Sequence, residues 1–468
     1  MIRNGKKKAI SCALVAAMSV GLAACGTTSY DFKVSYDGIK TGDVSSKVSV
    51  HDPSILKADG EYYIFGSHMS AAKSSDLLNW EKVADGYSKK NPVYGQIYDV
   101  ADEAFAYSGS KNSLIKTDDK QVHVWAPDVI YNETTGLYYM YYCTTSTWNA
   151  SNLCYGTSTT PEGPYEWQGA LIYSGFNRKT ISGTDVLDYV DEDYAYKNYI
   201  KGAQYNYEDY PNAIDPTVFY DADGRMWMVY GSWSGGIFLL EIDKTTGLVI
   251  HPEADKANNV DPYYGKRLLG GGHISIEGPY IMYDETSGYY YLFVSYGALT
   301  SNGGYQVRVF RSKTVDGEYV DMNGKYPEKS AQHQNFGLKL TGNYKLPSLE
   351  KAYMATGHNS AFVDDDGRMY LVYHTRFNDN GEGHSPRVHQ MLVNEDGWPC
   401  ELPYQTQGET VNKDGYDTDD IIGRYYVINQ GTAIDSKIAN PVILYLEKNG
   451  KVKGEKSEGT WECKDGSY

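Results

Sequence analysis

The stretch NAIDPTVFYDADGRMWMVYGS, residues 212–232, predicts a β-hairpin with a carboxylate at its mouth. Its first β-prone run ends at Tyr220, Asp223 and Gly224 supply a tight turn, and Met226 begins a second run that is almost entirely apolar. A strand of that composition is usually buried on both faces. The hairpin is therefore expected deep inside a stack of sheets.

Four other segments repeat this order of polar residue, strand, glycine turn and second strand. They are residues 51–67 (HDPSILKADGEYYIFGS), 125–143 (WAPDVIYNETTGLYYMYYC), 276–297 (IEGPYIMYDETSGYYYLFVSYG) and 357–375 (GHNSAFVDDDGRMYLVYHT). Further strand signals follow each copy, so each unit has about four strands, as in a propeller blade. We predict an all-β chain built on a five-bladed β-propeller. The alternative, unrelated hairpins of β-sandwiches, gives no reason for a repeated internal motif.

The first residues indicate export. Residues 1–24 combine a basic start, an apolar stretch and small residues, which is typical of a bacterial signal peptide. The ending Leu22-Ala23-Ala24-Cys25 resembles a lipobox, so we expect a lipid on Cys25 and a protein anchored on the outer side of a bacterial membrane. An ordinary signal with an incidental cysteine is the alternative. Residues 25–46 are then expected to be a polar spacer.

The remaining chain divides into a large and a small part. Residues 47–412 are predicted to form the propeller, and residues 421–468 carry β-meander signals of a small barrel-like domain, which is expected either to pack on the propeller or to be the first part of a longer domain. These few strands are too few for an independent core. Cys143 and Cys154 are expected either to pair across neighbouring strands or to be buried free thiols.

Charge and composition limit the partners. Loss of residues 1–24 removes four basic residues and no acids, which moves the formal net charge from −17 to −21. So acidic a chain is poorly suited to nucleic acid, whose phosphates require basic patches. Its 46 tyrosines offer flat faces and hydroxyls to sugars, although aromatic residues also simply favour strands. We expect a carbohydrate partner and a monomer.

Register predicts where the chemistry lies. The hairpin recurs once per blade, so Asp52, Asp215, Glu277 and His358 are expected at equivalent places around one end of a central channel, with Ala126 at the fifth. Asp215 and Glu277 would lie on neighbouring blades, and Asp52 across the channel. Each Asp-Pro pair alone is more typical of a turn. The recurrence of acids at one register favours a catalytic set.

Two nearby carboxyls are not both readily ionised. Asp215 is therefore expected to raise the pKa of Glu277 and keep it protonated as an acid, while the more distant Asp52 stays ionised as a base. A separation that admits a water molecule between base and sugar predicts an inverting glycoside hydrolase, and a closer pair predicts a retaining one.

The motifs HDPSI, WAPDVIY, AIDPTVFYDADGRMWMVYGSW and ISIEGPYI resemble those of glycoside hydrolase family 43. Through GHNSAF and RVHQM the chain is most similar to its endo-α-1,5-L-arabinanases. The resemblance implies a propeller and an inverting mechanism, with Asp52 as general base, Glu277 as general acid and Asp215 as pKa modulator. It also implies one calcium ion in the central channel, held mostly by water and by His358.

Several residues beside the carboxylates are candidates to contact sugar. They are His51, Trp125, Ile214, Trp233 and Tyr296, although packed core residues would give the same pattern. We expect hydrolysis of internal α-1,5 bonds of arabinan. The alternatives are an exo-acting α-L-arabinofuranosidase or β-xylosidase on the same scaffold and, more remotely, a surface lipoprotein that only binds glycans.

Overall fold

The computed structural model describes residues 29–37, 46–94, 101–117, 122–146, 149–327, 333–377, 382–412 and 414–464. Strands dominate this part of the chain and helices are short, so the predicted all-β class is confirmed. The expected signal peptide and the lipidation site Cys25 lie outside the described residues.

Five sheets follow one another along the chain. In the first four-stranded sheet the order is β1 (Ser54–Ala58), β2 (Glu61–Gly66), β3 (Ser70–Ser74) and β4 (Glu81–Ala84). The second contains β5 (Val124–Asn132), β6 (Leu137–Thr145), β7 (Ser151–Ser158) and β8 (Glu166–Ser174). The third contains β11 (Thr217–Tyr220), β12 (Met226–Tyr230), β13 (Ile237–Ile242), β16 (Gly265–Leu269) and β15 (Val260–Asp261), with β14 (Val249–Ile250) paired to β13. The fourth contains β17 (Ile276–Asp284), β18 (Tyr289–Tyr296), β19 (Gln306–Ser312) and β20 (Leu338–Lys339). The fifth contains β21 (Met354–Val363), β22 (Met369–Arg376), β23 (Ser385–Val393) and β24 (Pro399–Glu401).

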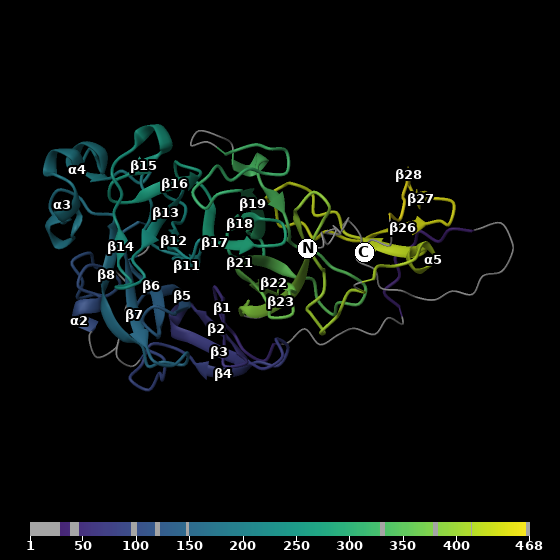
Figure 1. Cartoon of the computed structure of the whole chain (residues 1–468), viewed down its shortest axis with the longest axis horizontal. Helices are drawn as coiled ribbons and strands as arrows, with labels where there is room; N and C mark the ends of the chain where they lie inside the picture. The colour runs from purple at the N-terminus through teal and green to yellow at the C-terminus, as the bar shows by residue number, and fades with distance from the viewer. Residues whose placement is uncertain are drawn as a thin grey trace, which may run out of the picture.

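The five sheets close on one another. Their first strands touch in the cycle β1, β5, β11, β17, β21 and back to β1, and Figure 1 shows the sheets following in chain order. A buried apolar cluster lies between each pair of successive sheets, and the last one joins Ile64 on β2 to Val372 on β22. Each sheet therefore buries both faces against its neighbours, which explains the long apolar strands.

The hairpin that sets the pattern forms as predicted. Strands β11 and β12 pair from Thr217 opposite Val229 to Tyr220 opposite Met226. At the turn, Gly224 takes a left-handed φ of 75°, which glycine adopts without steric cost. The Asp221 carboxylate accepts hydrogen bonds from the backbone N–H of Asp223 and Arg225, both at 2.9 Å. Local chemistry therefore fixes the register of this strand pair.

The entrance to each first strand has the same backbone kink. Asp52, Ala126, Asp215, Gly278 and His358 have φ values of 55°, 40°, 56°, 55° and 49°. In the second, fourth and fifth sheets the ladder skips the kinked residue and the next one. Left-handed backbone at a non-glycine residue is uncommon and costs on the order of 1–3 kcal/mol, and such sites cluster where function requires them.

This kink corrects the predicted register of the fourth sheet. The residue equivalent to Asp52 and Asp215 is Gly278, not Glu277. Glu277 lies one place earlier, at the position that Trp125 occupies in the second sheet, since each is the last paired residue before the skip. A side chain at Gly278 would meet the His358 ring, whose Cγ lies 3.1 Å from an ideal Cβ. The fourth sheet therefore carries its acid on the preceding residue.

Polar contacts tie the inner strands together. The buried Asp128 on β5 accepts from the Ser54 hydroxyl on β1 and from the Val218 N–H on β11, the latter at 2.6 Å. Thr217 donates to the Pro279 carbonyl at 2.8 Å, and Ser360 donates to the Pro53 carbonyl at 2.8 Å. Buried hydrogen bonds of this kind hold the strand entrances at fixed relative positions.

The long connection after β8 folds onto the rim of the sheets. Short elements form here: the 3-10 helix η2 (Ile181–Gly183), helices α3 (Val186–Tyr189) and α4 (Glu192–Asn198), and the strand pair β9 (Ile200–Lys201) and β10 (Gln204–Tyr205). Elsewhere lie α2 (Ala101–Ala104) and the 3-10 helices η1 (Ser67–Met69), η3 (Lys256–Asn258) and η4 (His333–Asn335). Tyr199 and Tyr205 are buried in the core between the second and third sheets. Much of the tyrosine content is therefore structural.

A sixth sheet lies at the C-terminal end (Figure 1). It follows helix α5 (Thr418–Ile421) and contains β25 (Gly423–Val427), β26 (Val442–Leu446), β27 (Lys451–Gly454) and β28 (Glu458–Thr460). Residues 29–37, inside the expected spacer, pack against it: the rings of Tyr30 and Phe32 lie 5.2 and 5.7 Å from that of Tyr445. This segment is therefore part of the folded structure, because its aromatic side chains have apolar partners there.

Cys143 and Cys154 are buried free thiols. They lie on β6 and β7, but Cys143 pairs with Leu153 and Cys154 with Tyr142. Successive side chains on a strand point to opposite faces, so the two sulfurs face different cores. Of the two alternatives, the structure has the free thiols.

Candidate active site

A cavity of about 380 Å³ opens at the end of the ring where the first strands begin. The three predicted carboxylates and His358 all line it. The complete lining is His51, Asp52, His68, Trp125, Asn212, Ile214, Asp215, Ser232, Trp233, His273, Glu277, Leu299 and His358. Residues more than 300 positions apart in the chain thus meet around one space.

Two imidazoles and a hydroxyl group surround the Asp52 carboxylate. Its Oδ1 lies 3.0 Å from His358 Nδ1 and 3.1 Å from His51 Nε2, and its Oδ2 accepts from the Ser67 hydroxyl. Burial alone would raise the pKa of Asp52, but the neighbouring imidazoles of His358 and His51 hold it well below its usual range. Asp52 is therefore ionised near neutrality and suited to act as a base.

Glu277 accepts two short hydrogen bonds, and the Ser232 hydroxyl donates to its Oε2 at 3.4 Å. Trp233 Nε1 donates to Oε2 at 2.6 Å and the Tyr305 hydroxyl donates to Oε1 at 2.7 Å. Burial raises the pKa of Glu277 and the negative charge of Asp52 adds to this effect, while the Tyr305 and Trp233 hydrogen bonds and His358 oppose it. A carboxyl with a raised pKa retains a proton that it can donate.

Asp215 is buried beside these groups, and its Oδ2 accepts from the Gly278 N–H at 3.2 Å. Burial raises its pKa to about 7; the charges of Glu277 and Asp52 act in the same direction and His358 opposes them. The role of Asp215 as modulator of Glu277 stays a prediction, because the pKa of Glu277 is set mainly by burial, Tyr305, His358 and Asp52.

His358 links the carboxylates. Burial would lower its pKa, but Asp52, Asp215 and Glu277 raise it to about 9. It also lines a second, small cavity of about 10 Å³, together with Asn359 and the residues that follow each kink. The Asn359 side-chain amide is buried and makes no hydrogen bond to the described residues. The Asn359 amide is therefore available to hydrogen-bond or to bind an ion in this small cavity.

Three imidazoles meet beside Asp52. One ring nitrogen from each of His51, His374 and His384 lies within 4.8 Å of the others. The rings of His51 and His384 stack with centroids 3.8 Å apart, and that of His374 stands edge-on at 5.0 and 4.9 Å from them. Burial lowers the pKa of His51 to about 4 and of His384 to about 3, so both are neutral near pH 7.

The predicted sugar-contacting residues divide into two groups. His51, Trp125, Ile214 and Trp233 line the large cavity, and Trp233 also binds Glu277. Tyr296 does not line it: the side chain is 0% exposed, and the Arg308 guanidinium lies 4.8 Å from the ring centroid. Tyr296 therefore packs in the core, because at the end of β18 it points away from the channel.

Two contacts to the carboxylates were not predicted from the sequence. Tyr305 reaches Glu277 from the segment just before β19, and Ser67 in η1 connects Asp52 to the Ala126 N–H, which donates to its hydroxyl at 2.8 Å. Ser67 ends the first repeat, so its place could have been compared with Ser232 in the third. Tyr305 has no such repeat signal.

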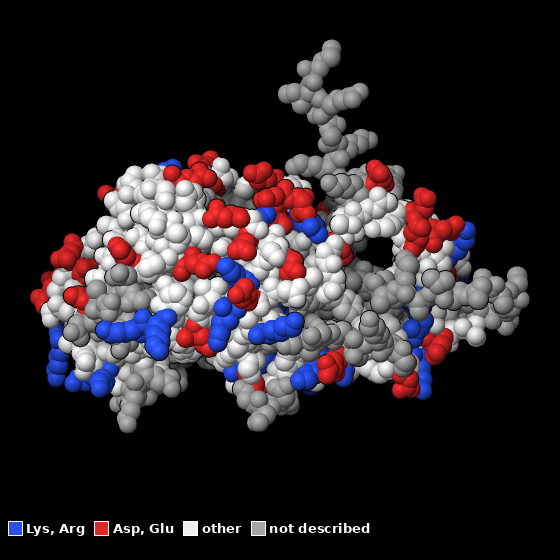
Figure 2. All heavy atoms as spheres, turned by 90° about the horizontal axis from the view of Figure 1, so that it is seen from below, with Lys and Arg blue, Asp and Glu red and all other residues white. Residues whose placement is uncertain are grey.

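The surface agrees with the acidic composition. Figure 2 shows one face on which Asp and Glu are widely spread, while Lys and Arg gather mainly toward one edge. No helix within the described ranges is long and apolar enough to cross a membrane. This face does not offer the broad basic surface that a polyphosphate would need.

The arrangement defines a class of protein before any comparison. A carboxyl group with a lowered pKa and one with a raised pKa that face one cavity are the base and acid that a glycoside hydrolase requires. Comparison with known sequences identifies the particular family: the pattern described as glycosyl hydrolases family 43 matches residues 44–209 and 191–399. The chain belongs to this family and is a glycoside hydrolase. A C-terminal lipocalin-like domain of the same family matches residues 403–468.

Similar proteins extend over most of the chain. An extracellular endo-α-(1→5)-L-arabinanase of Thermotoga petrophila is 39% identical over 429 residues, covering 89% of this chain and 83% of that protein. The extracellular endo-α-(1→5)-L-arabinanase 2 of Bacillus subtilis is 37% identical over 444 residues, with the same coverages. The crystal structure of an endo-1,5-α-L-arabinanase from Thermotoga petrophila superposes with a TM-score of 0.75 at 37% identity, covering 91% of this chain and 88% of that one.

Proposed function

We propose that this protein is an endo-arabinanase that hydrolyses internal α-1,5-L-arabinofuranosidic bonds of arabinan. The observation that carries the proposal is the pair of endo-arabinanases that are 39% and 37% identical over 89% of the chain. The cavity supports it, because it combines a base, an acid and two tryptophans that offer flat faces to a sugar ring.

The proposed mechanism is inversion at the anomeric carbon. Asp52 accepts a proton from the attacking water while Glu277 donates one to the departing sugar oxygen. Asp215 acts as the pKa modulator and orienting group, and its carboxylate accepts from the N–H of Gly278, the residue after Glu277. The opposite pKa directions of Asp52 and Glu277 support this assignment of roles.

The proposed scaffold is a five-bladed β-propeller over residues 47–412, followed by a barrel-like domain over residues 421–468. The closed cycle of first strands and the five apolar clusters between successive sheets support the propeller. The match of residues 403–468 to a lipocalin-like domain supports the second unit.

Calcium is proposed as the ion of the central channel, held by His358 and water. His358 Nδ1 contacts the Asp52 carboxylate, and ligating histidines commonly have a carboxylate partner of this kind. Because the pKa of His358 is raised to about 9, a metal at Nε2 would have to displace the proton there. The unsatisfied Asn359 amide offers an oxygen, which calcium prefers. The residues therefore fit the ion, and its charge would help to keep Asp52 ionised.

Export and anchoring are proposed from the N-terminal residues. The similar arabinanases are described as extracellular, which supports export. A lipid on Cys25 would hold the protein on the outer side of the membrane, and mass spectrometry of the membrane fraction would detect the modified cysteine.

The lengths of the released oligosaccharides test whether the enzyme cuts within the arabinan chain. An exo-acting relative exists at lower similarity: an extracellular exo-α-(1→5)-L-arabinofuranosidase of Cellvibrio japonicus is 27% identical and covers 76% of the chain. We expect early digests of linear arabinan to contain a range of oligosaccharides, with slower action on branched arabinan and none on xylan. Release of monomer alone would show an exo enzyme, and binding without products would show a glycan-binding protein.

A further inference from the structure

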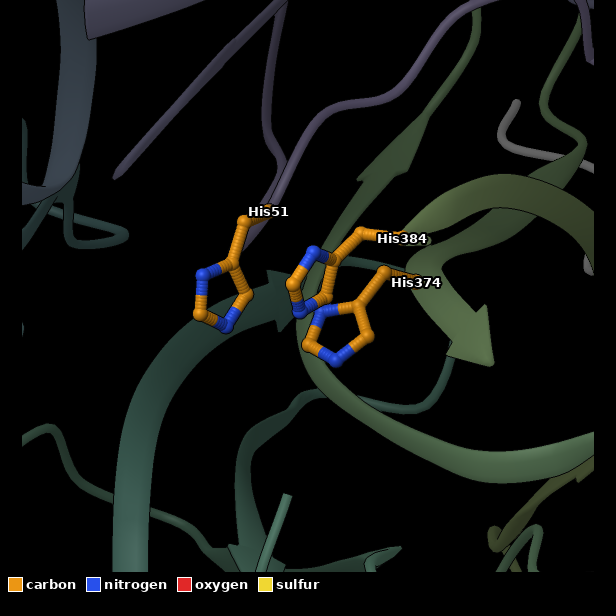
Figure 3. A group of neighbouring side chains, drawn as sticks. All are labelled: His51, His374 and His384. Atoms are coloured by element: carbon orange, nitrogen blue, oxygen red, sulfur yellow. The ribbon is translucent and has the colours of Figure 1, made fainter. Parts of the chain in front are cut away.

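His51, His374 and His384 form a cluster that the proposed hydrolysis does not explain. The histidines come from three places: His51 precedes β1, His374 lies on β22 and His384 precedes β23. Figure 3 shows their rings gathered together. Only His51 lines the large cavity, so contact with sugar does not account for the other two.

The cluster has the donor chemistry of a transition-metal site. Three neutral imidazoles are a common zinc ligand set, with a fourth position left open. Among the described residues, His374 Nε2 and His384 Nε2 are buried without a hydrogen-bond partner. His374 is 0% exposed, and a buried polar atom of this kind is normally satisfied by protein, water or an ion.

The spacing is close to what coordination needs. Bonds of 2.0–2.1 Å in a tetrahedral zinc site place neighbouring nitrogens about 3.4 Å apart. The three nitrogens here lie within 4.8 Å of one another, and the stacked rings of His51 and His384 would have to turn so that their in-plane lone pairs meet at one ion. The nearby Arg376 opposes a cation, but its charge is partly offset by Glu382 at 3.8 Å.

Asp52 lies directly beside the cluster. Its Oδ1 lies 3.1 Å from His51 Nε2, and its backbone N–H donates to His374 Nδ1 at 3.4 Å, which leaves His374 Nε2 as the free nitrogen. We propose that His51, His374 and His384 bind a divalent transition-metal ion of the zinc class, that Asp52 becomes its fourth ligand, and that the bound ion stops hydrolysis by occupying the base. The site is distinct from the calcium site, because calcium prefers oxygen ligands and imidazole favours zinc, nickel and copper.

The test uses the mature chain without a histidine tag, kept in calcium. Titration with Zn²⁺ by calorimetry should show one ion per chain, and Co²⁺ should give the intense visible bands of four-coordinate nitrogen and oxygen ligation. Hydrolysis of linear arabinan should fall in proportion to zinc occupancy. Removal of one ligand in His384→Gln should weaken zinc binding at least about tenfold and shift inhibition, relative to the same variant without zinc, by the same factor.

A matched control is His251→Gln, since His251 is partly buried against Tyr189 in another part of the molecule; it should bind zinc like the wild type. Equal zinc affinity in His384→Gln, or no stoichiometric zinc in the wild type, would overturn the site. If His384→Gln fails to fold, the Co²⁺ spectrum of the wild type decides, and weak six-coordinate bands overturn the site. Full occupancy without inhibition overturns the role of Asp52. The inhibition assay rests on the proposed function, whereas zinc binding is measured without substrate. A failure of the zinc site can therefore be distinguished from a failure of the proposed arabinanase activity.

Discussion

Replacement of Glu277 by Gln tests the acid directly. The substitution keeps the shape of the side chain and removes the proton that the departing sugar needs. Loss of a general acid typically lowers the rate by about 10² to 10⁴, which corresponds to about 2.7–5.5 kcal/mol of transition-state free energy. We expect kcat on linear arabinan to fall in this range while sugar binding persists.

The structure also predicts a cost in stability. Both Glu277 oxygens accept hydrogen bonds, from Trp233 at 2.6 Å and Tyr305 at 2.7 Å. A Gln amide has one acceptor oxygen, so one of the two donors would face an N–H, at a cost of about 1–3 kcal/mol. Glu285→Gln is the matched control, because Glu285 is exposed in the turn that follows β17.

The decisive assay varies the leaving group. An aryl arabino-oligosaccharide with a nitrophenyl group needs little protonation, so Glu277→Gln should lose much less activity on it than on arabinan. An equal loss on both substrates would show that Glu277 acts through structure alone, and undiminished hydrolysis of arabinan would refute its role as the acid.

Three further predictions follow from the same geometry. Because the pKa of Asp52 is lowered and that of Glu277 is raised, a plot of kcat/KM against pH should be bell-shaped, with activity lost at low pH when the base protonates and at high pH when the acid ionises. Tyr305→Phe removes a hydrogen bond that lowers the pKa of Glu277, so the alkaline limb of the variant should move to higher pH. An unmoved alkaline limb would contradict this link. Gly278→Ala should lower activity and the melting temperature more than Gly224→Ala. Both glycines have positive φ, which strains alanine by about 1–2 kcal/mol, but only Gly278 faces the His358 ring. Equal losses in the two variants would argue against crowding at Gly278. Complete removal of calcium by a chelator should lower both activity and melting temperature, with recovery on re-addition of Ca²⁺, and a fully demetallated protein with unchanged properties would exclude the ion.

Repeat patterns predicted the class of fold and the strand pairs well. The alternation of apolar strands and glycine turns in residues 212–232 gave β11 and β12 in the right place, because turn chemistry and burial act locally. The convergence of Asp52, Asp215 and Glu277 followed from their place in each repeat and from the resemblance to a family. The repeat positions and the family motifs can both be read from the sequence.

The missed features depend on contacts between distant segments. The one-residue offset at Glu277 arises from the kink at Gly278, which the sequence shows only as a Gly-Pro pair. Tyr305 reaches the acid from a connecting segment, and Tyr296 was assigned to the cavity although its strand position turns it into the core. Of the three histidines beside Asp52, His374 and His384 come from the fifth sheet and the loop before its strand β23, and His51 precedes the first sheet, so no spacing in the sequence could have joined His51 to the other two.

The shared kink has a consequence for how such an enzyme can change. All five inner strands have a left-handed residue at or near their start, whether that residue is Asp, Ala, Gly or His. The backbone conformation at these five places is therefore the same with four different residue types. Ala126 is the position with a short apolar side chain, and it lies against a cavity of only about 10 Å³, so a larger side chain there would need the surrounding residues to move. New reactivity at Ala126 would therefore require several coordinated replacements rather than one.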